Sequence, residues 1–255
     1  MASGHGPRTV DAVQTSCDIV DALKELNGAG ISELARYLDL SKGTVHSHIS
    51  TLKQNEYVIK DGDEYRLSLR FLDLSEHVLA RMNIQGVVKE GLRELAEDTG
   101  EIAQFAVEEH DRAVYVRKVR GEKAVQTASH IGTREYLHCI SLGKVLLAHM
   151  PRSRVEQVIE RHGLPKKTEN TITDPDALFQ ELEVVREQGH AFDDEENIHG
   201  LRCVAAPALD GNGNIIGTVS VSGPASRLTG EKFRTELPEK VKRTSNIIEI
   251  NLQYS

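Results

Sequence analysis

The sequence lacks features that would assign it to several other classes of protein. Its 255 residues contain no apolar run of the roughly 18–20 residues that a membrane-spanning helix needs, so we expect no membrane partner. The three cysteines, Cys17, Cys139 and Cys203, are odd in number and widely spaced, which argues against a disulfide framework and for the reducing cytoplasm. The polar segment from Met1 to Thr9 has no hydrophobic stretch typical of a secretory signal.

Positive charge is also scarce. The chain has 31 Lys and Arg against 39 Asp and Glu, and its net charge of −8 at pH 7 argues against a protein that coats nucleic acid through bulk charge. The hydrophobic fraction of 39% and the charged fraction of 27% are those of a globular protein, which excludes extensive disorder and collagen-like repeats. The length allows one large domain or two small ones, each with a core.

Motifs for catalysis or metal binding are missing too. No His-Glu-x-x-His or Cys-x-x-Cys occurs, and Gly143-Lys144 lacks the glycines and the Ser/Thr of a phosphate-binding loop. The turn Asp210–Gly213 is not followed by a helix and is no dinucleotide loop. A hydrolase with a Cys203 nucleophile would need a histidine that the sequence does not place nearby. We predict no enzyme, no catalytic residues, no metal and no cofactor.

Residues 1–69 have the pattern of a winged helix-turn-helix domain. Apolar residues at spacings of three and four predict a first helix from Val10 to Leu26. Two shorter helices follow, which we expect Ser32 and Ser41 to cap. The β-prone runs at 57–60 and 64–67 flank an Asp-Gly pair, which predicts a hairpin. Such a unit inserts its last helix into the major groove of DNA.

The third helix carries the predicted DNA contacts. The segment from Ser41 to Asn55 contains Lys42 and Lys53 and no acid, although residues 1–82 carry a net charge of −3 from nine basic and twelve acidic side chains. Its polar face lies opposite the apolar one and offers hydrogen-bonding groups to phosphates and base edges. A protein-interaction module with a polar face remains an alternative. The predicted contacts are Ser41, Lys42, Thr44, His46, Ser47, Ser50 and Lys53.

The rest of the chain mixes helices and strands. We predict a linker helix at 70–83 and a second domain at 84–255 that begins with a helix from Ile84. Alternating residues near 103–107 and 114–119 predict strands, and Asp210–Gly213 predicts a hairpin between the strands 201–209 and 214–222. Further predicted helices are 141–150, 151–161, one from Pro175 to Gln188 between Asp174 and Gly189, and a last helix capped by Thr229.

Several segments resemble the IclR family of transcriptional regulators, and the resemblance covers about residues 7–254. The segments 12–23, 41–46 and 55–58 are similar to the family's DNA-binding module. The segments 132–134, 142–148, 192–207 and 220–224 are similar to its effector domain, and 192–207 is the most specific of them. One departure matters: Ser47 stands where the family commonly has an arginine, the strongest reader of guanine. The family's operator preference therefore does not transfer.

The resemblance implies a fold and a ligand site. The fold is α+β: a winged helix-turn-helix, a linker helix, and a GAF-like effector-binding domain with an antiparallel sheet flanked by helices. It also implies homodimers or dimers of dimers, and a small carboxylate held by the amides of Ser141 and Leu142 and by four side chains. These side chains are Asp193, Cys203, Ser220 and Ser222. Ser141 replaces a residue that is commonly smaller in the family.

The residues themselves agree with part of this site. A helix that begins at Ser141 would offer free N–H groups to an anion, and Ser220 and Ser222 would face the same side of a strand. Asp193 would need a hydroxyl donor on the ligand, or its own proton, which favours a hydroxy acid, a keto acid or a sugar acid. Other interpretations stay open: Cys203 as a small core residue, the acidic run 193–196 as a solvated turn, and the two serines as ordinary strand positions.

These observations predict a ligand-responsive transcriptional regulator whose partners are operator DNA and a small organic or sugar-derived acid. Two further classes remain open. A small-molecule enzyme with a helical appendage would show turnover and tolerate changes in the third helix. A protein-interaction scaffold would show no salt-dependent binding to DNA.

Overall fold

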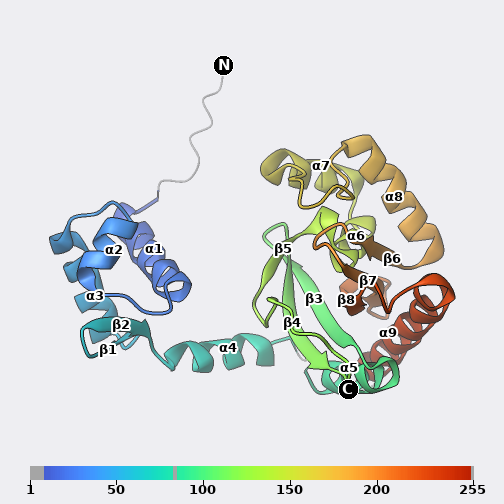
Figure 1. The fold of residues 1–255 in the computed structure, drawn as a ribbon, viewed down its shortest axis with the longest axis horizontal. Coiled ribbons are helices and arrows are strands. Elements are labelled where there is room, and N and C mark those ends of the chain that lie inside the picture. Colours follow the sequence, from blue (N-terminus) through green and yellow to red (C-terminus); the bar gives the residue numbers. More distant parts are fainter. Residues whose placement is uncertain (1–8, 83–84, 254–255) are drawn as a thin grey trace. The chain divides into compact units, whose positions relative to one another are not determined.

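A computed structural model describes residues 9–82 and 85–253. The chain divides into two compact units, Met1–Met82 and Asn83–Ser255 (Figure 1). Ile84, where the predicted second domain and its first helix begin, lies outside the described residues. Within the described ranges, no helix is both long and apolar enough to cross a bilayer.

The first unit has the predicted order of three helices, a hairpin and a further helix. Its core is formed by apolar side chains at the helical spacings seen in the sequence, among them Ile19, Leu34, Val45 and Ile49. The hairpin adds Val58 to this core. The elements are α1 (Asp11–Glu25), α2 (Ile31–Tyr37), α3 (Lys42–Gln54), β1 (Val58–Asp61), β2 (Glu64–Leu67) and α4 (Arg70–Ala80).

The starts of α3 and α2 test two predicted caps. Ser41 caps α3 as predicted, because its hydroxyl oxygen accepts a hydrogen bond from the Thr44 N–H at 3.0 Å. The prediction that Ser32 caps α2 is wrong, since α2 begins at Ile31 and Gly30 holds the N-cap position without a side-chain bond. Ala29 exchanges two backbone hydrogen bonds with Tyr65 of β2, which keeps the chain extended up to the helix start.

Helix α4 occupies most of the segment predicted as a linker helix. None of its residues is buried within the first unit. Its apolar side chains are open to solvent: Leu72 is 63% exposed and Val78 is 58% exposed, and Leu69 just before the helix is 80% exposed.

The second unit is built on one antiparallel sheet with the strand order β5-β4-β3-β8-β7-β6. The predicted hairpin at Asp210–Gly213 joins β7 to β8, which confirms that prediction. Two edge strands, β5 and β6, were not predicted. The strands are β3 (Ile102–Glu109), β4 (Arg112–Arg120), β5 (Arg134–Tyr136), β6 (Ala191–Asp194), β7 (Leu201–Leu209) and β8 (Ile215–Pro224).

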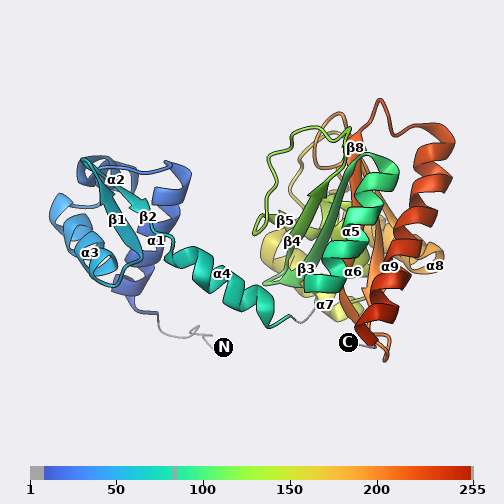
Figure 2. The same ribbon diagram turned by 90° about the horizontal axis from the view of Figure 1, so that it is seen from below.

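Helices cover both faces of this sheet. Helices α5 (Gln85–Thr99) and α9 (Leu237–Gln253) lie side by side on one face (Figure 2). On the other side α6 (Ser141–Ala148) packs on the strands, next to α8 (Pro175–Gln188), with α7 (Arg152–His162) beyond. The alternation of apolar residues that predicted β3 is therefore not matched by an alternation of buried and exposed side chains. Its residues from Ile102 to Ala106 are all buried, because neither face meets solvent.

Two further helix ends were predicted. Asp174 caps α8 by accepting from the Ala177 N–H at 2.9 Å, and Gly189 ends the helix in the left-handed region at φ 72°, as predicted. The start of the last helical segment was predicted correctly: helical residues run from Gly230, directly after Thr229, through a π-helical turn, Lys232–Glu236, into α9. Thr229 accepts from the Phe233 N–H at 3.3 Å through its carbonyl oxygen, and no capping bond of its side chain is seen among the described residues.

Candidate functional site

Helix α3 presents the polar face that the sequence predicted. Val45 and Ile49 are buried in the first unit, while Lys42, His46 and Lys53 are exposed on the other side. Not every predicted DNA contact is equally free. The Ser41 hydroxyl caps the helix, and the Ser47 hydroxyl donates to Gly43 O at 3.0 Å, as a local bond within the helix; Thr44 is half-buried and Ser50 is exposed.

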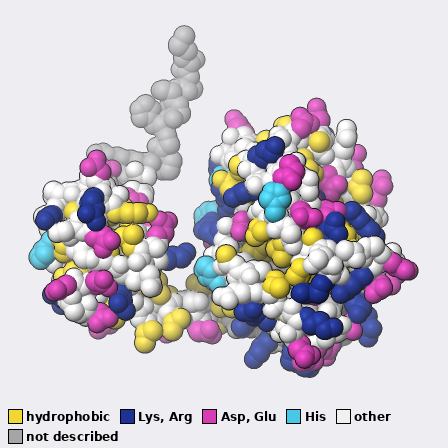
Figure 3. All heavy atoms as spheres, in the orientation of Figure 1, with side chains coloured by type: hydrophobic (Ala, Val, Ile, Leu, Met, Phe, Trp, Pro, Cys, Tyr) yellow, Lys and Arg dark blue, Asp and Glu magenta, His cyan; other side chains and the backbone are white. Residues whose placement is uncertain are grey.

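The charge around α3 is mixed rather than uniformly positive. Figure 3 shows basic and acidic side chains interspersed over the visible face of the first unit. Arg66 of the hairpin is partly neutralised by Asp61 and Glu64, each at 3.2 Å. Helix α3 itself contains two lysines and no acid, so the charge along this helix is positive.

The predicted ligand residues converge in the second unit. All six of them line one cavity of about 160 Å³ between the sheet and α6. One water molecule takes up about 30 Å³ in the liquid, so this space has room for a small metabolite. The six are Ser141, Leu142, Asp193, Cys203, Ser220 and Ser222.

The first turn of α6 supplies backbone donors to this cavity. The first N–H of α6 that bonds within the helix is that of Lys144, which donates to Ile140 O at 3.0 Å. The amides of Ser141 and Leu142 precede it and lie at the positive end of the helix dipole. Gly143 lets this turn sit directly on the preceding chain, because a Cβ there would come within 2.2 Å of Leu137 O.

Strand β8 supplies two hydroxyls on one side of the sheet. Ser222 donates to Gln104 Oε1 of β3 at 3.0 Å. Ser220 is fully buried, and its hydroxyl has no hydrogen-bond partner within the described chain. Buried hydroxyls are almost always paired in folded proteins, so Ser220 is a polar group prepared for a ligand or an ordered water.

Asp193 of β6 closes one edge of the cavity. Its Oδ1 accepts from the Glu196 N–H at 2.8 Å and from the Asn197 N–H at 3.4 Å. Burial, together with the nearby charge of Glu196, raises the pKa of Asp193 to about 7. The carboxyl group is therefore partly protonated near neutral pH, which reduces its repulsion of an anion. This residue lies in a strand and not in the solvated turn that was an alternative.

Cys203 faces Asp193 from the neighbouring strand β7, where the two residues pair in register. Burial and the charge of Asp193 raise the pKa of the Cys203 thiol well above its ordinary value. The residue is thus a neutral thiol at physiological pH and a poor nucleophile. It lines the cavity as a small, weakly polar wall.

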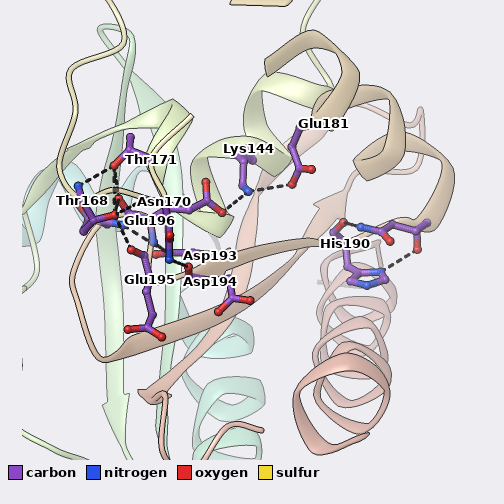
Figure 4. Close-up of polar contacts among 12 residues, drawn as sticks. Lys144, Thr168, Asn170, Thr171, Glu181, His190, Asp193, Asp194, Glu195 and Glu196 are labelled. Atoms are coloured by element: carbon purple, nitrogen blue, oxygen red, sulfur yellow. Dashed lines mark hydrogen bonds and ion pairs between the residues drawn. The ribbon is translucent and has the colours of Figure 1, made fainter. Parts of the chain in front are cut away.

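A buried ion-pair cluster supports this end of the cavity. Lys144 of α6 is 1% exposed, and its ammonium contacts Glu196 at 2.6 Å and Glu181 of α8 at 2.9 Å (Figure 4). Burial disfavours the charged form of Lys144, but the two carboxylates outweigh it and raise its pKa. Because the Glu196 N–H also binds Asp193, the cluster joins α6, α8 and the segment after β6 into one support.

Sequence reasoning missed several groups of this site. In the sequence, Lys144 was examined only as part of a possible phosphate-binding loop, which it does not form. In the structure it makes ion pairs with Glu181 and Glu196. The cavity is also lined by Gln104, Tyr115 and Glu135 and by the loop 127–133. Lys118 secures that loop with hydrogen bonds to Thr127 Oγ1 at 2.7 Å and Ser129 Oγ at 3.0 Å. A polar residue inside the apolar run of β3, Gln104, was the one signal available.

The structure offers no alternative centre for metal chemistry in its described parts. Across residues 9–82 and 85–253, no three His, Cys, Asp or Glu side chains are grouped to hold a metal ion. His138, next to Cys139 in the sequence, contacts Pro165 O at 3.1 Å instead.

Comparisons with known proteins identify both units. The IclR helix-turn-helix domain matches residues 12–62, and the bacterial transcriptional regulator IclR C-terminal domain matches residues 76–250. The "Probable HTH-type transcriptional regulator ArcR" of Halobacterium salinarum is 35% identical over 99% of this chain and 97% of its own length.

Solved structures show the same fold. The crystal structure of the Thermotoga maritima IclR has a TM-score of 0.79 and 29% identity, covering 96% of this chain and 99% of that one. An IclR homolog from Microbacterium hydrocarbonoxydans, complexed with 4-hydroxybenzoate, has a TM-score of 0.80 at 20% identity and covers 96% of this chain and 100% of its own. The predicted family and the α+β fold class are confirmed, and these relatives are regulators and not enzymes. The chain belongs to the IclR family of bacterial transcriptional regulators.

Proposed function

We propose that this regulator reads a partly palindromic operator with α3 and changes its DNA binding when a small organic acid fills the cavity of its second unit. The observation that carries the proposal is the convergence of six residues, separated by up to 81 positions, on one cavity that contains the unpartnered hydroxyl of Ser220. A cavity prepared only for packing would not hold an unpaired buried hydroxyl.

In the DNA-bound state α3 enters the major groove and the hairpin approaches the backbone. Lys42 and Lys53 contact phosphates, and His46 and Ser50 lie on the same exposed face as candidates for base contacts. Ser41, Thr44 and Ser47 contribute through remaining acceptor positions or through water. With two lysines on the helix, each copy binds weakly, and two copies on two half-sites supply the affinity.

In the effector-bound state the carboxylate of the ligand lies at the amides of Ser141 and Leu142, where the helix dipole favours an anion. Ser220 donates to it or to a neighbouring oxygen, and the Ser222 oxygen, whose hydrogen is bonded to Gln104, accepts from a hydroxyl of the ligand. Asp193 accepts from a hydroxyl of the ligand or shares its own proton. A family relative that binds 4-hydroxybenzoate, which is itself a hydroxy acid, supports this ligand class.

We further infer that the protein acts as a homodimer or as a dimer of dimers. The support is the solvent-exposed apolar side of α4, with Leu72 and Val78 more than half exposed. Isolated monomers rarely leave such a row uncovered. Sedimentation of the full-length protein tests this inference, since Leu72→Glu with Val78→Glu should then yield a monomer with weakened operator binding.

The ligand regulates only if it binds the DNA-competent and DNA-incompetent arrangements with different affinity. The test is a binding assay on the DNA upstream of the protein's own gene, with and without candidate acids. Asp193→Ala with Ser222→Ala should abolish the response to acid and leave the DNA affinity of the free protein unchanged.

The matched control is Asp176→Ala with Ser153→Ala, two exposed positions of the same unit outside the cavity. The control should respond as the wild type does. A cavity variant with a normal response would remove the cavity from the proposal, and binding that does not change with salt would favour a protein-interaction role for α3.

A further inference from the structure

The floor of the cavity runs across the whole sheet. Every strand places at least one lining side chain on the same face, in the spatial order of the strands. Register fixes neighbours in this row, since Gln104 pairs with Ser220 and Ser222 pairs with Cys203. From β5 to β6 the polar members are Glu135, Tyr115, Gln104, Ser220 with Ser222, Cys203 and Asp193.

The β5–β4 end of this row has no role in the site described above. Glu135 is half-buried, and its carboxylate makes no hydrogen bond to any residue that the structure describes. Tyr115 is 7% exposed, and its hydroxyl likewise has no hydrogen-bond partner within the described ranges. Glu135 pairs with Ala113 of β4, two residues before Tyr115, so the two side chains lie on the same face of neighbouring strands. Both residues line the cavity, so a molecule in the cavity can bond to both groups.

Neighbouring cations do not neutralise Glu135 by direct contact. The Arg112 guanidinium lies over the Tyr136 ring at 3.5 Å from its centroid, and the Lys167 ammonium lies 5.2 Å from the same centroid. Neither forms an ion pair with Glu135 within 4.0 Å among the described residues. Burial raises the pKa of Glu135 in spite of the charges of Lys167 and Arg112, which oppose the shift. Glu135 therefore lines the cavity without an ion-pair partner among the described residues.

Only some chemical groups satisfy both side chains. A ligand hydroxyl can donate to the Glu135 carboxylate and accept from the Tyr115 hydroxyl at the same time. An ammonium group has no acceptor for Tyr115, and it would also face the charges of Lys167 and Arg112. A methyl group would leave both polar groups unpaired. A ligand that carries a methyl in place of the hydroxyl should therefore bind much more weakly.

We propose that Glu135 and Tyr115 form a hydroxyl-binding pole of the effector cavity, which selects acids that carry a hydroxyl group in addition to the carboxylate bound at α6. The proposal rests on the proposed effector site and adds to it two specificity-determining residues. Short-chain acids without a hydroxyl then enter the cavity but bind more weakly, because Glu135 and Tyr115 gain no hydrogen bond from them.

The test is calorimetric titration of the full-length protein with pairs of acids of equal chain length that differ in hydroxylation: pyruvate and hydroxypyruvate, butanoate and 4-hydroxybutanoate, hexanoate and gluconate. In at least one pair we expect the hydroxylated acid to bind ten times more tightly or better. Glu135→Leu should reduce that ratio to near one, while leaving the affinity for the plain acid within about threefold. Tyr115→Phe should reduce the ratio in part.

Glu135→Gln keeps an acceptor oxygen and should retain part of the preference, which separates loss of a hydrogen bond from loss of folding. Glu122→Leu is the matched control, since Glu122 is exposed and lies outside the cavity lining. Equal binding within every pair, or a preference that survives Glu135→Leu, would overturn this inference and leave the effector site standing. Binding of no acid at all by the wild type would overturn both.

Discussion

The two units of this regulator use polar side chains in opposite ways. Within the described residues, every buried polar or charged side chain lies in the second unit, at or beyond Thr99. The first unit buries an apolar core and keeps its polar groups exposed, on α3 above all. A surface that meets a large polyanion needs exposed donors and cations, whereas a cavity that selects a small acid needs buried polar groups that the ligand itself can pair.

The buried cation of the effector unit provides the strongest test of this comparison. Lys144→Met should leave Glu181 and Glu196 without their cation and lower the free energy of unfolding of this unit by about 3–5 kcal/mol. Thermal unfolding followed by circular dichroism should show the loss in the effector unit, with the transition of the first unit unchanged.

Lys240→Met is the matched control, because the pair of Lys240 with Asp98 is partly exposed on both sides and should contribute no more than about 1 kcal/mol. Adding Glu181→Gln and Glu196→Gln to Lys144→Met should recover much of the stability by removing the uncompensated charges. Equal losses for Lys144→Met and Lys240→Met would contradict the view that the buried cluster supports the cavity.

The exposed cations of α3 test the other side of the comparison. Lys42→Ala with Lys53→Ala should weaken binding to every DNA sequence, by about tenfold or more at moderate salt, because each lysine releases counterions from a phosphate. The slope of log K against log salt should become shallower by about 2 for each bound copy, and so by about 4 for a dimer on two half-sites. Fluorescence anisotropy over a salt series measures both quantities.

Lys89→Ala with Lys166→Ala, two exposed positions of the second unit, serves as the control and should keep the wild-type slope. If the α3 variant bound DNA with an unchanged slope, α3 would not be the element that meets the phosphates.

Asp193 gives a prediction about pH. Its pKa of about 7 lies above the value of about 3.9 in an unfolded chain, so the native state binds the extra proton between these values. The stabilisation is complete below pH 4 and is lost as the pH rises through 7. Urea unfolding from pH 5 to 8 should show a wild-type free energy of unfolding that falls, relative to Asp193→Asn, by up to about 1.4 kcal/mol per pH unit below 7.

The raised pKa values of Glu196 and Glu135, each caused by burial, add slopes of the same sign, and the comparison with Asp193→Asn removes them. Asp176→Asn, at an exposed position of α8, should reproduce the wild-type profile. Parallel profiles for the wild type and Asp193→Asn would show that Asp193 does not exchange its proton in this range.

The same contrast explains what the sequence could predict. The first unit follows from local rules: apolar spacing set its helices, Ser41 fixed the start of α3, and an Asp-Gly pair marked the hairpin. Most helix ends in the second unit also followed from such rules. The prediction that Ser32 caps α2 failed because a long-range β-bridge between Ala29 and Tyr65 helps to set where α2 begins.

The cavity depends on contacts between distant parts of the chain. Strand β3 lies between β4 and β8, and local spacing does not reveal that neighbour. The family resemblance supplied six lining residues, and the structure brings them together. It did not supply Tyr115 or Glu135, which join the row only through the sheet order, nor Lys144, whose charge is hidden by two carboxylates from other segments.

The smallest expected effect concerns the cap that orients the exposed helix. Ser41→Ala removes the acceptor of the Thr44 N–H at 3.0 Å and should destabilise the first unit by about 1 kcal/mol, measured by urea unfolding. Ser32→Ala is the matched control, because Ser32 lies inside the first turn of α2 and Gly30 is the N-cap there. It should be neutral or slightly stabilising, since alanine favours a helix interior. Equal effects of the two changes would mean that α3 is held by its apolar face alone, so that its polar side serves DNA and contributes nothing to folding.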